Sequence, residues 1–195
     1  MESPQVHESL RNPPATLPLA ERVNFQSVFE GLFVKALGPV SPLVKQELKA
    51  VGVDLDRLQA AYPHTVLFAA LDVASRHWFP GEPVQSAYLK LGLRNVEGFF
   101  ETPMGRPLLA LLKLMGVKRT LGRMRTNLRS ANNYADTKLA EVSATEFQLW
   151  VNEPGDFRFF TQGVIQGGVR LTGAPNGVVT VIDTNELGTV YQIKL

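Results

Sequence analysis

The sequence contains no cysteine, so disulfide bonds, cysteine-ligated zinc, iron–sulfur clusters and thiol catalysis are excluded. It contains only three histidines, and none has a second histidine or a paired carboxylate at the spacing of metal ligands. One of them, His77, follows Asp72 and Arg76 at a place where a helix C-terminus favours a histidine. We therefore expect His77 to cap or pack rather than to bind heme, and we predict no metal site.

Long apolar runs and the common catalytic motifs are also missing. No apolar run is long enough to span a membrane, and the first residues include Glu2, His7 and Glu8 instead of the basic-then-apolar pattern of a signal peptide. There is no Gly-x-Ser-x-Gly elbow, Walker loop or dinucleotide fingerprint. We therefore expect a soluble cytoplasmic protein that is not an enzyme.

The composition fits a globular domain with a core of its own. Of the 195 residues, 45% are apolar and 19% are charged, and the formal net charge is +2 at pH 7. That charge is far from the strongly basic balance of a dedicated nucleic-acid binder. Four prolines and no periodic pattern predict a flexible arm at residues 1–20. Residues 21–195 are expected to form a single domain, with a helical half at 21–133 and a strand-rich half at 134–195.

Apolar residues recur at helical spacing through the first two thirds of the chain. Proline, glycine and capping residues divide this region into about six helices, near residues 21–37, 42–51, 54–61, 64–78, 84–100 and from 104 onwards. Glycine costs about 1 kcal/mol relative to alanine in a helix interior. Gly31, inside the first helix, therefore predicts a close approach to a neighbouring element.

The end of this helical region, residues 113–135, combines an apolar stripe with a cationic surface. The stripe steps by three or four residues through Leu114, Val117, Leu121, Met124 and Leu128. The cationic positions, called the basic face below, are Lys118, Arg119, Arg123, Arg125 and Arg129.

Three interpretations of the basic face are open. It can form ordinary ion pairs with nearby carboxylates, for which the candidates are Glu97, Glu101, Asp136 and Glu141. It can bind the acidic surface of a partner protein, or it can bind the phosphates of a nucleotide, a nucleic acid or an acidic lipid surface. No aromatic residue in the window before Tyr134 is available to stack on bases, which disfavours single-stranded nucleic acid.

After Tyr134 the pattern changes to the alternation typical of strands, near residues 137–142, 146–151, 178–182 and 189–195. Between the second and third of these, Phe160, Val164 and Leu171 belong to a helical spacing that favours a short helix. The glycines of this helix indicate close packing, since no Lys-Ser or Lys-Thr follows them as in a phosphate loop. The sequence thus predicts an α+β fold, a helical bundle followed by an antiparallel β-sheet with one inserted helix.

Several motifs carry a family resemblance: Glu30-Gly31-Leu32-Phe33, Phe79-Pro80-Gly81, Thr102-Pro103-Met104-Gly105-Arg106, Arg119-Thr120-Leu121-Gly122-Arg123-Met124, Asn132-Asn133-Tyr134 and the segment 162–174. With them, the chain resembles a family of uncharacterised proteins, a domain of unknown function with many paralogues in myxobacteria. The resemblance covers nearly the whole chain after the arm. It implies no established activity.

The order of helices, hairpin, glycine-containing helix and closing hairpin is more distantly similar to one superfold. That superfold includes heme–nitric-oxide-binding domains, 4-vinyl-reductase-type regulatory domains and small subunits of vesicle-tethering complexes. The similarity implies a cavity between helices and sheet and a helix-mediated dimer. Tyr134-Ala135-Asp136-Thr137-Lys138 does not match the Tyr-x-Ser-x-Arg clamp of the heme branch, and a Cys/His metal cluster is excluded without cysteine. We therefore predict no heme and no other cofactor.

The sequence leaves several functions open. The leading hypothesis is a non-enzymatic regulatory or scaffold domain that binds a partner protein, as a homodimer formed through apolar helix faces. The alternative is a sensor that binds a small apolar ligand between helices and sheet. Aromatic residues from several predicted helices are the candidates for lining such a pocket: Phe29, Phe33, Trp78, Phe99 and Phe160. The third hypothesis is nucleotide or nucleic-acid binding by the basic face.

Overall fold

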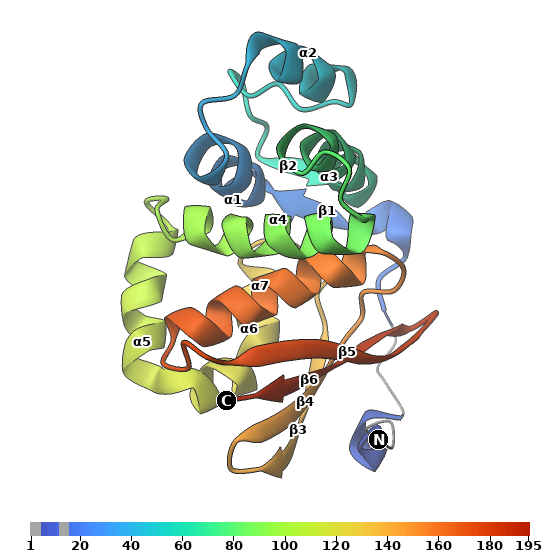
Figure 1. Cartoon of the computed structure of the whole chain (residues 1–195), viewed down its shortest axis with the longest axis vertical. Coiled ribbons are helices and arrows are strands. Elements are labelled where there is room, and N and C mark those ends of the chain that lie inside the picture. The colour runs from blue at the N-terminus through green and yellow to red at the C-terminus, as the bar shows by residue number, and fades with distance from the viewer. Residues whose placement is uncertain (1–4, 12–15) are drawn as a thin grey trace.

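A computed structural model describes residues 5–11 and 16–195 of the chain. Helices fill the N-terminal part and a sheet the C-terminal part, with α4 and α7 between them (Figure 1). The helical elements are η1 (Glu8–Leu10), η2 (Leu19–Glu21), α1 (Gln26–Phe29), the π-helix η3 (Glu30–Ala36), α2 (Pro42–Ala50), α3 (His64–Trp78), α4 (Val84–Phe99), α5 (Gly105–Gly122), α6 (Met124–Arg129) and α7 (Phe157–Leu171). The strands are β1 (Val23–Phe25), β2 (Ala61–Pro63), β3 (Thr137–Ser143), β4 (Glu146–Val151), β5 (Val178–Asn185) and β6 (Gly188–Lys194). No helix in the described part combines the length and apolar character needed to cross a bilayer.

The order of these elements confirms the predicted α+β class. In the described residues, α1 to α6 precede the main sheet, and α7 is inserted between β4 and β5. The strands of the main sheet run in the order β3-β4-β6-β5, and each neighbouring pair is antiparallel. A second sheet, the pair β1 and β2 with Asn24 opposite Tyr62, was not predicted. Strands of three residues are too short to show a periodic pattern.

One face of the main sheet packs on α7. Phe147, Leu149 and Val151 alternate along β4 and are buried on this face, as their spacing predicted. They share an apolar cluster with Ile165 and Val169 of α7. The inserted helix therefore covers the sheet and joins it to the helical half.

The opposite face of the sheet contacts the N-terminal segment. Leu10 is buried beside Trp150, which points away from the face that packs on α7. The prediction of a flexible arm is thus corrected for residues 5–11, which pack on the sheet because Leu10 finds an apolar partner there. The remainder of the segment before residue 16, at 1–4 and 12–15, lies outside the described residues.

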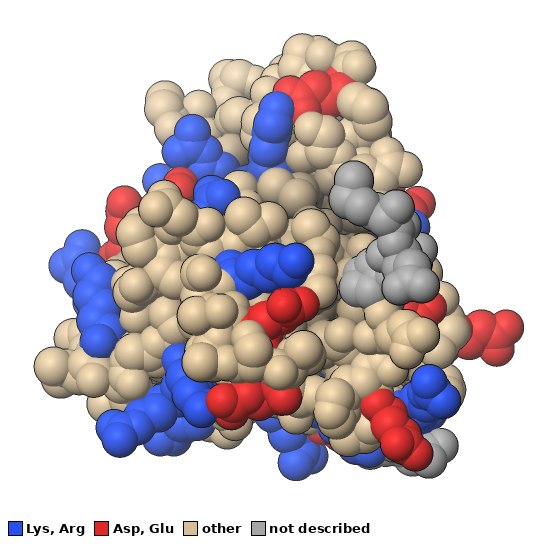
Figure 2. All heavy atoms as spheres, turned by 60° about the horizontal axis from the view of Figure 1, so that its bottom comes forward, with Lys and Arg blue, Asp and Glu red and all other residues tan. Residues whose placement is uncertain are grey.

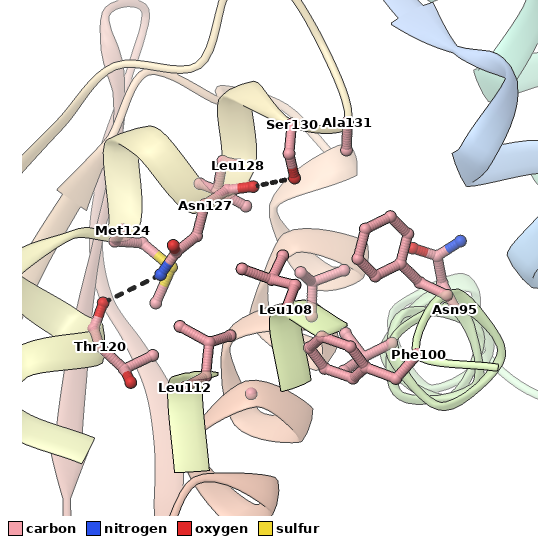
Figure 3. Close-up of a pocket in the computed structure, with 14 residues that line it drawn as sticks. Asn95, Phe100, Leu108, Leu112, Thr120, Met124, Asn127, Leu128, Ser130 and Ala131 are labelled. Carbon is pink, nitrogen blue, oxygen red and sulfur yellow. Dashed lines mark hydrogen bonds between the residues drawn. The ribbon is translucent and has the colours of Figure 1, made fainter. Parts of the chain in front are cut away.

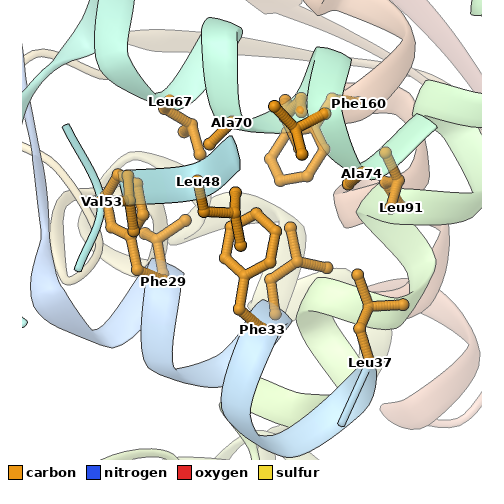
Figure 4. Packing of buried hydrophobic residues seen from close by; sticks show 14 of the residues in the cluster. Phe29, Phe33, Leu37, Leu48, Val53, Leu67, Ala70, Ala74, Leu91 and Phe160 are labelled. Carbon is orange, nitrogen blue, oxygen red and sulfur yellow. The ribbon is translucent and has the colours of Figure 1, made fainter. Parts of the chain in front are cut away.

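The principal core lies among the helices of the N-terminal half. Phe29 and Phe33 are fully buried and belong to one cluster with Leu48 of α2 and Leu67 of α3 (Figure 4). Phe160 of α7 also belongs to this cluster. Burying a side chain of this size contributes about 1.5–3 kcal/mol, so this cluster accounts for much of the stability of the helical half.

Helix α2 shows how local sequence sets an element's ends. The Ser41 side chain accepts a hydrogen bond from the backbone N–H of Val44, and Pro42 occupies the first turn. Gly52, just after the helix, has a φ of +99°, a conformation that other residues rarely adopt.

The backbones of the π-helix η3 and of α4 are in direct contact. A Cβ atom on Gly31 would lie 2.8 Å from the backbone nitrogen of Phe99. Across the same contact, a Cβ on Gly98 would overlap the Gly31 carbonyl oxygen. The close approach predicted from Gly31 is confirmed.

Helix α5 differs from the single regular helix that the sequence predicted. Gly116 has φ +73° and ψ 171°, so α5 is kinked there, and Gly122 ends it before α6 begins. The kink removes Leu114 from the predicted stripe: its side chain is 86% exposed. Val117, Leu121 and Met124, after the kink, are buried as predicted.

Candidate functional site

A cavity of about 90 Å³ lies among α4, α5, α6 and α7, and we call it the helical cavity (Figure 3). Its wall is mostly apolar, formed by Val96, Phe99, Phe100, Leu108, Leu112, Met124, Leu128, Val164 and small residues. Four polar residues complete the wall: Asn95, Thr120, Asn127 and Ser130. A mostly apolar concavity with a few polar groups is the usual form of a small-molecule site.

The break between α5 and α6 shapes this wall. Because α5 ends at Gly122 and α6 starts at Met124, the chain turns and brings Asn127 back to Thr120. The side-chain Nδ2 of Asn127 donates to the Thr120 carbonyl at 3.2 Å. Two helices close in sequence thus form one side of the cavity, and α4 and α7 form the other.

A second, inner cavity of about 50 Å³ adjoins the first. The two share Asn95, Leu128, Ala131 and Val164 in their walls. The inner cavity extends toward the sheet at Val151 and toward polar side chains that the helical cavity lacks.

These polar side chains belong to a buried cluster assembled from distant parts of the chain: Arg22, Asn24, His64, Tyr134 and Glu153, all at most 7% exposed. The Arg22 guanidinium lies 3.4 Å from the Glu153 carboxylate. The Tyr134 hydroxyl donates to the other Glu153 oxygen at 3.0 Å and lies 3.0 Å from Nδ1 of His64. We call this group the buried polar cluster. It joins the first strand, α3, the link before β3 and the end of β4.

Burial dominates the protonation of the cluster. It raises the pKa of the Glu153 carboxyl to about 8, against the opposing effects of Arg22 and the Tyr134 hydroxyl. Burial and repulsion from Arg22 lower the pKa of His64 to about 4, so His64 is neutral at pH 7. The Asn24 amide donates to Nδ1 of His64 at 3.1 Å. The ring proton is therefore on Nε2, which lies 3.6 Å from Glu153.

Two of the five predicted pocket-lining aromatics line these cavities. Phe99 lines the helical cavity and Phe160 the inner one. Phe29 and Phe33 are instead fully buried in the helical core, and Trp78 packs against that core while partly exposed. The sequence could not separate these cases, because a core position and a cavity wall have the same apolar pattern.

The basic face is exposed at all five positions, and several of its side chains are engaged locally. Lys118 pairs with Glu141 at 2.7 Å and Arg125 with Asp136 at 3.2 Å, two of the carboxylates named from the sequence. Arg129 donates to backbone carbonyl oxygens. Basic and acidic groups adjoin on the face shown in Figure 2. For Arg119 and Arg123, no ion pair forms among the described residues.

Sequence reasoning missed both the polar wall residues and the buried polar cluster. His64 was considered only as a metal ligand, and within the described residues no group of three or more acidic or histidine side chains could hold a metal ion. Arg22 and Glu153 are 131 positions apart, so no local pattern pointed to their contact. The available signal was position. A charged residue next to strongly apolar segments is a candidate for burial together with a partner of opposite charge.

Comparisons with known proteins give a family and a fold. The family model described as Protein of unknown function (DUF2378) matches residues 22–194. No curated protein matches the chain. An H-NOX protein from S. oneidensis in the Fe(II)NO state has 13% identity and a TM-score of 0.65, over 88% of this chain and 98% of that one. A mutant H-NOX protein from K. algicida, in the Fe(II) unliganded state, has 12% identity and a TM-score of 0.60, over 87% and 95%.

A third solved structure concerns modulation of heme redox potential through porphyrin distortion. It has 16% identity and a TM-score of 0.55, over 88% of this chain and 99% of that one. At such identities the likeness shows a shared fold. It confirms the distant resemblance to heme–nitric-oxide-binding domains that the sequence indicated.

The prediction of no cofactor is corrected by these comparisons, because the structural neighbours are H-NOX proteins described in Fe(II) states and, in one case, for heme. An axial ligand to heme iron is typically histidine, cysteine, methionine or tyrosine. Among the described residues, the helical cavity is lined by Met124 but by no histidine, cysteine or tyrosine. The buried His64 is held by Asn24 and Tyr134. The described wall of the helical cavity thus does not fit a histidine-ligated heme.

Proposed function

This chain belongs to the family described as Protein of unknown function (DUF2378), and from that premise we propose a non-catalytic sensor domain that binds a small apolar ligand in the helical cavity. The observation that carries the proposal is the cavity of about 90 Å³ with its mostly apolar wall. Close-packed interiors rarely leave such a space, so one bounded by four helices favours a binding role. The ligand is held among helices, and among the described residues the main sheet contributes Val151 to the inner cavity.

Helix α5 offers a route from the cavity to the surface. Leu108 and Leu112 line the cavity. On other sides of the same helix, Leu111 is 47% and Leu114 86% exposed. If α5 can adopt two placements relative to the cavity, a ligand that binds one placement more tightly would increase its population. The exposed leucines would move with the helix.

Filling the cavity should abolish binding of a small apolar probe. We expect toluene to give saturable shifts of the backbone amide signals of α4 to α6 in ¹H–¹⁵N spectra of the wild type. Leu108→Trp places a larger side chain in the wall, so we expect at least about tenfold weaker binding, equivalent to about 1.4 kcal/mol. The matched control is Leu43→Trp, which changes an exposed leucine on α2 and should leave the titration unchanged. Absence of saturable shifts in the wild type, or full binding by Leu108→Trp, would contradict the proposal.

A second candidate function, docking of a protein through α5, is favoured by the exposed apolar side chains there. Met104 is 60% exposed just before α5, in addition to Leu111 and Leu114 on the helix. Apolar side chains grouped on a surface mark interaction sites.

This candidate predicts self-association, for which the second copy is the docking partner. We expect a concentration-dependent dimer in analytical ultracentrifugation and at least about tenfold weaker association for Leu114→Glu, because a carboxylate would be desolvated at the contact. Leu43→Glu is the control. A wild type that stays monomeric at the highest soluble concentration would rule out this candidate and leave the proposal of a ligand site in the helical cavity unaffected.

A further inference from the structure

Each polar side chain in the wall of the helical cavity donates a hydrogen bond to a backbone carbonyl oxygen of the protein. Asn95 Nδ2 donates to the Val28 carbonyl at 2.9 Å, and Asn127 Nδ2 donates to the Thr120 carbonyl at 3.2 Å. The hydroxyl of Thr120 donates to the Gly116 carbonyl at 2.9 Å. The hydroxyl of Ser130 donates to the Asn127 carbonyl at 2.6 Å. Each of the two hydroxyls has thereby committed its only proton.

These bonds also fix the orientation of the two amides. A backbone carbonyl can only accept, so the amide atom that faces it must be nitrogen in both Asn95 and Asn127. The amide oxygen then points the other way. Figure 3 shows the two asparagines on opposite sides of the cavity, with the nitrogen of Asn127 directed at Thr120. Neither amide oxygen accepts a hydrogen bond from any described residue.

The amide oxygens are accessible rather than sealed. Among the described residues, the only fully buried side-chain polar atom without a partner is Ser27 Oγ. The unbonded oxygens of Asn95 and Asn127 must therefore reach accessible space. Asn95 is only 7% exposed and lines both the helical and the inner cavity, so the cavities supply that space for its oxygen. Asn127 is half-buried and also lines the helical cavity.

From this geometry, and resting on the proposed function, we infer that the ligand is an uncharged apolar molecule with a hydroxyl or N–H group that donates to one of the two amide oxygens, that of Asn127 or that of Asn95. An oxygen-only ligand, such as an ether or ketone, could accept only from the second N–H of an amide and would leave both amide oxygens unpaired. A carboxylate or phosphate would meet the lone pairs of those oxygens and would be desolvated without a cation in the wall. A cation would also be desolvated without a carboxylate there, which favours a neutral donor.

Phenol, anisole and toluene separate this inference from the proposed function. Phenol has a donor, anisole has only an acceptor, and toluene has neither. Because phenol is better hydrated than anisole, an apolar cavity alone would bind anisole more tightly. We expect the wild type to bind phenol about fivefold more tightly than anisole, as one net hydrogen bond provides.

The variant Asn127→Leu keeps the size of the side chain and removes the acceptor. We expect Asn127→Leu, or the corresponding Asn95→Leu, to bind anisole at least as tightly as phenol, and the variant that reverses the wild-type order identifies the acceptor. Asn176→Leu, on an exposed turn outside the helical cavity, is the matched control and should keep the wild-type order. The comparison of probes on the wild type stands on its own should Asn127→Leu fail to fold.

Each outcome has a distinct meaning. Phenol binding more tightly than anisole in the wild type but not in one of the variants Asn127→Leu and Asn95→Leu supports the inference. Binding of toluene and anisole without a preference for phenol overturns it and leaves the proposed function intact. No binding of any of the three overturns both. A preference for phenol that persists in Asn127→Leu and in Asn95→Leu overturns the assignment of the acceptors.

Discussion

Gly163→Ala is expected to lower the free energy of unfolding by about 3 kcal/mol or more, the upper range for overpacking. A Cβ atom on Gly163 would overlap the carbonyl oxygen of Leu89, and one on Gly92 would overlap that of Phe160. The obstructing atoms are backbone, which cannot rotate away as a side chain can. The methyl group would therefore force α4 and α7 apart, and with them the walls of both cavities.

Gly168→Ala is the matched control, because nothing lies within 4 Å of a Cβ built on Gly168 in the same helix. Replacing glycine by alanine inside a helix stabilises it by about 1 kcal/mol when there is room. Urea unfolding of both variants measures the contrast. Equal effects of the two substitutions would mean that α4 and α7 are not in backbone contact.

The helix α7 shows what sequence patterns can predict. Phe160, Val164 and Leu171 repeat at helical intervals in a segment whose neighbours alternate, and the structure has a helix at Phe157–Leu171. Two of its glycines were also interpreted correctly as packing positions, since Gly163 meets α4 and a Cβ on Gly167 would lie 3.1 Å from Val96, whereas Gly168 has room for a Cβ. Periodicity reports which side of an element is buried, and here that was sufficient.

Periodicity failed at α5 because one residue changed the direction of the helix. The stripe was correct from Val117 to Met124, but the positive φ of Gly116 turns the preceding part of the helix, so Leu114 is 86% exposed. Glycine permits that conformation without requiring it. The kink is therefore decided by tertiary packing, which a single sequence does not show.

The candidate site was predictable only in kind. A cavity between elements was implied by the superfold resemblance, and Phe99 and Phe160 were among the aromatics proposed to line it. The asparagines were missed because their role depends on which backbone carbonyl each amide faces. Asn95 bonds Val28 across 67 positions, and no spacing rule relates two such residues.

The buried polar cluster yields the second large expected effect. Arg22→Met should cost about 3 kcal/mol of unfolding free energy at pH 9, where the wild-type Glu153 carboxyl is ionised and Arg22 is its cation. Arg22 also donates to the carbonyl oxygens of Leu17 and Asn152, and those bonds would be lost as well. Chemical unfolding of the wild type, the two single variants and the double variant with Glu153→Gln would separate the contributions.

The free energy of unfolding of the wild type should fall as pH rises above 6.5. Burial raises the folded-state pKa of Glu153 from 4.5 to about 8, so its contribution to stability is complete below pH 4.5 and is lost as pH rises through 8. His64, whose pKa is lowered from 6.5 to about 4, acts in the opposite direction and loses its contribution as pH falls below 6.5. The interval from pH 6.5 to 9 therefore isolates Glu153, and we expect the wild type to lose about 2 kcal/mol between pH 6.5 and 8.

Arg22 opposes the raised pKa of Glu153, so its removal should raise that pKa further. The cost of Arg22→Met is then expected to grow above pH 8, by up to about 1.4 kcal/mol for each pH unit, as the unfolded chain ionises and the folded one does not. In the Glu153→Gln background this growth should vanish, since no carboxyl remains to titrate. A cost that is the same at pH 6.5 and 9, or the same in both backgrounds, would show that Arg22 acts through packing and backbone hydrogen bonds alone. The attraction between the charges of Arg22 and Glu153 would then contribute nothing to the free energy of unfolding.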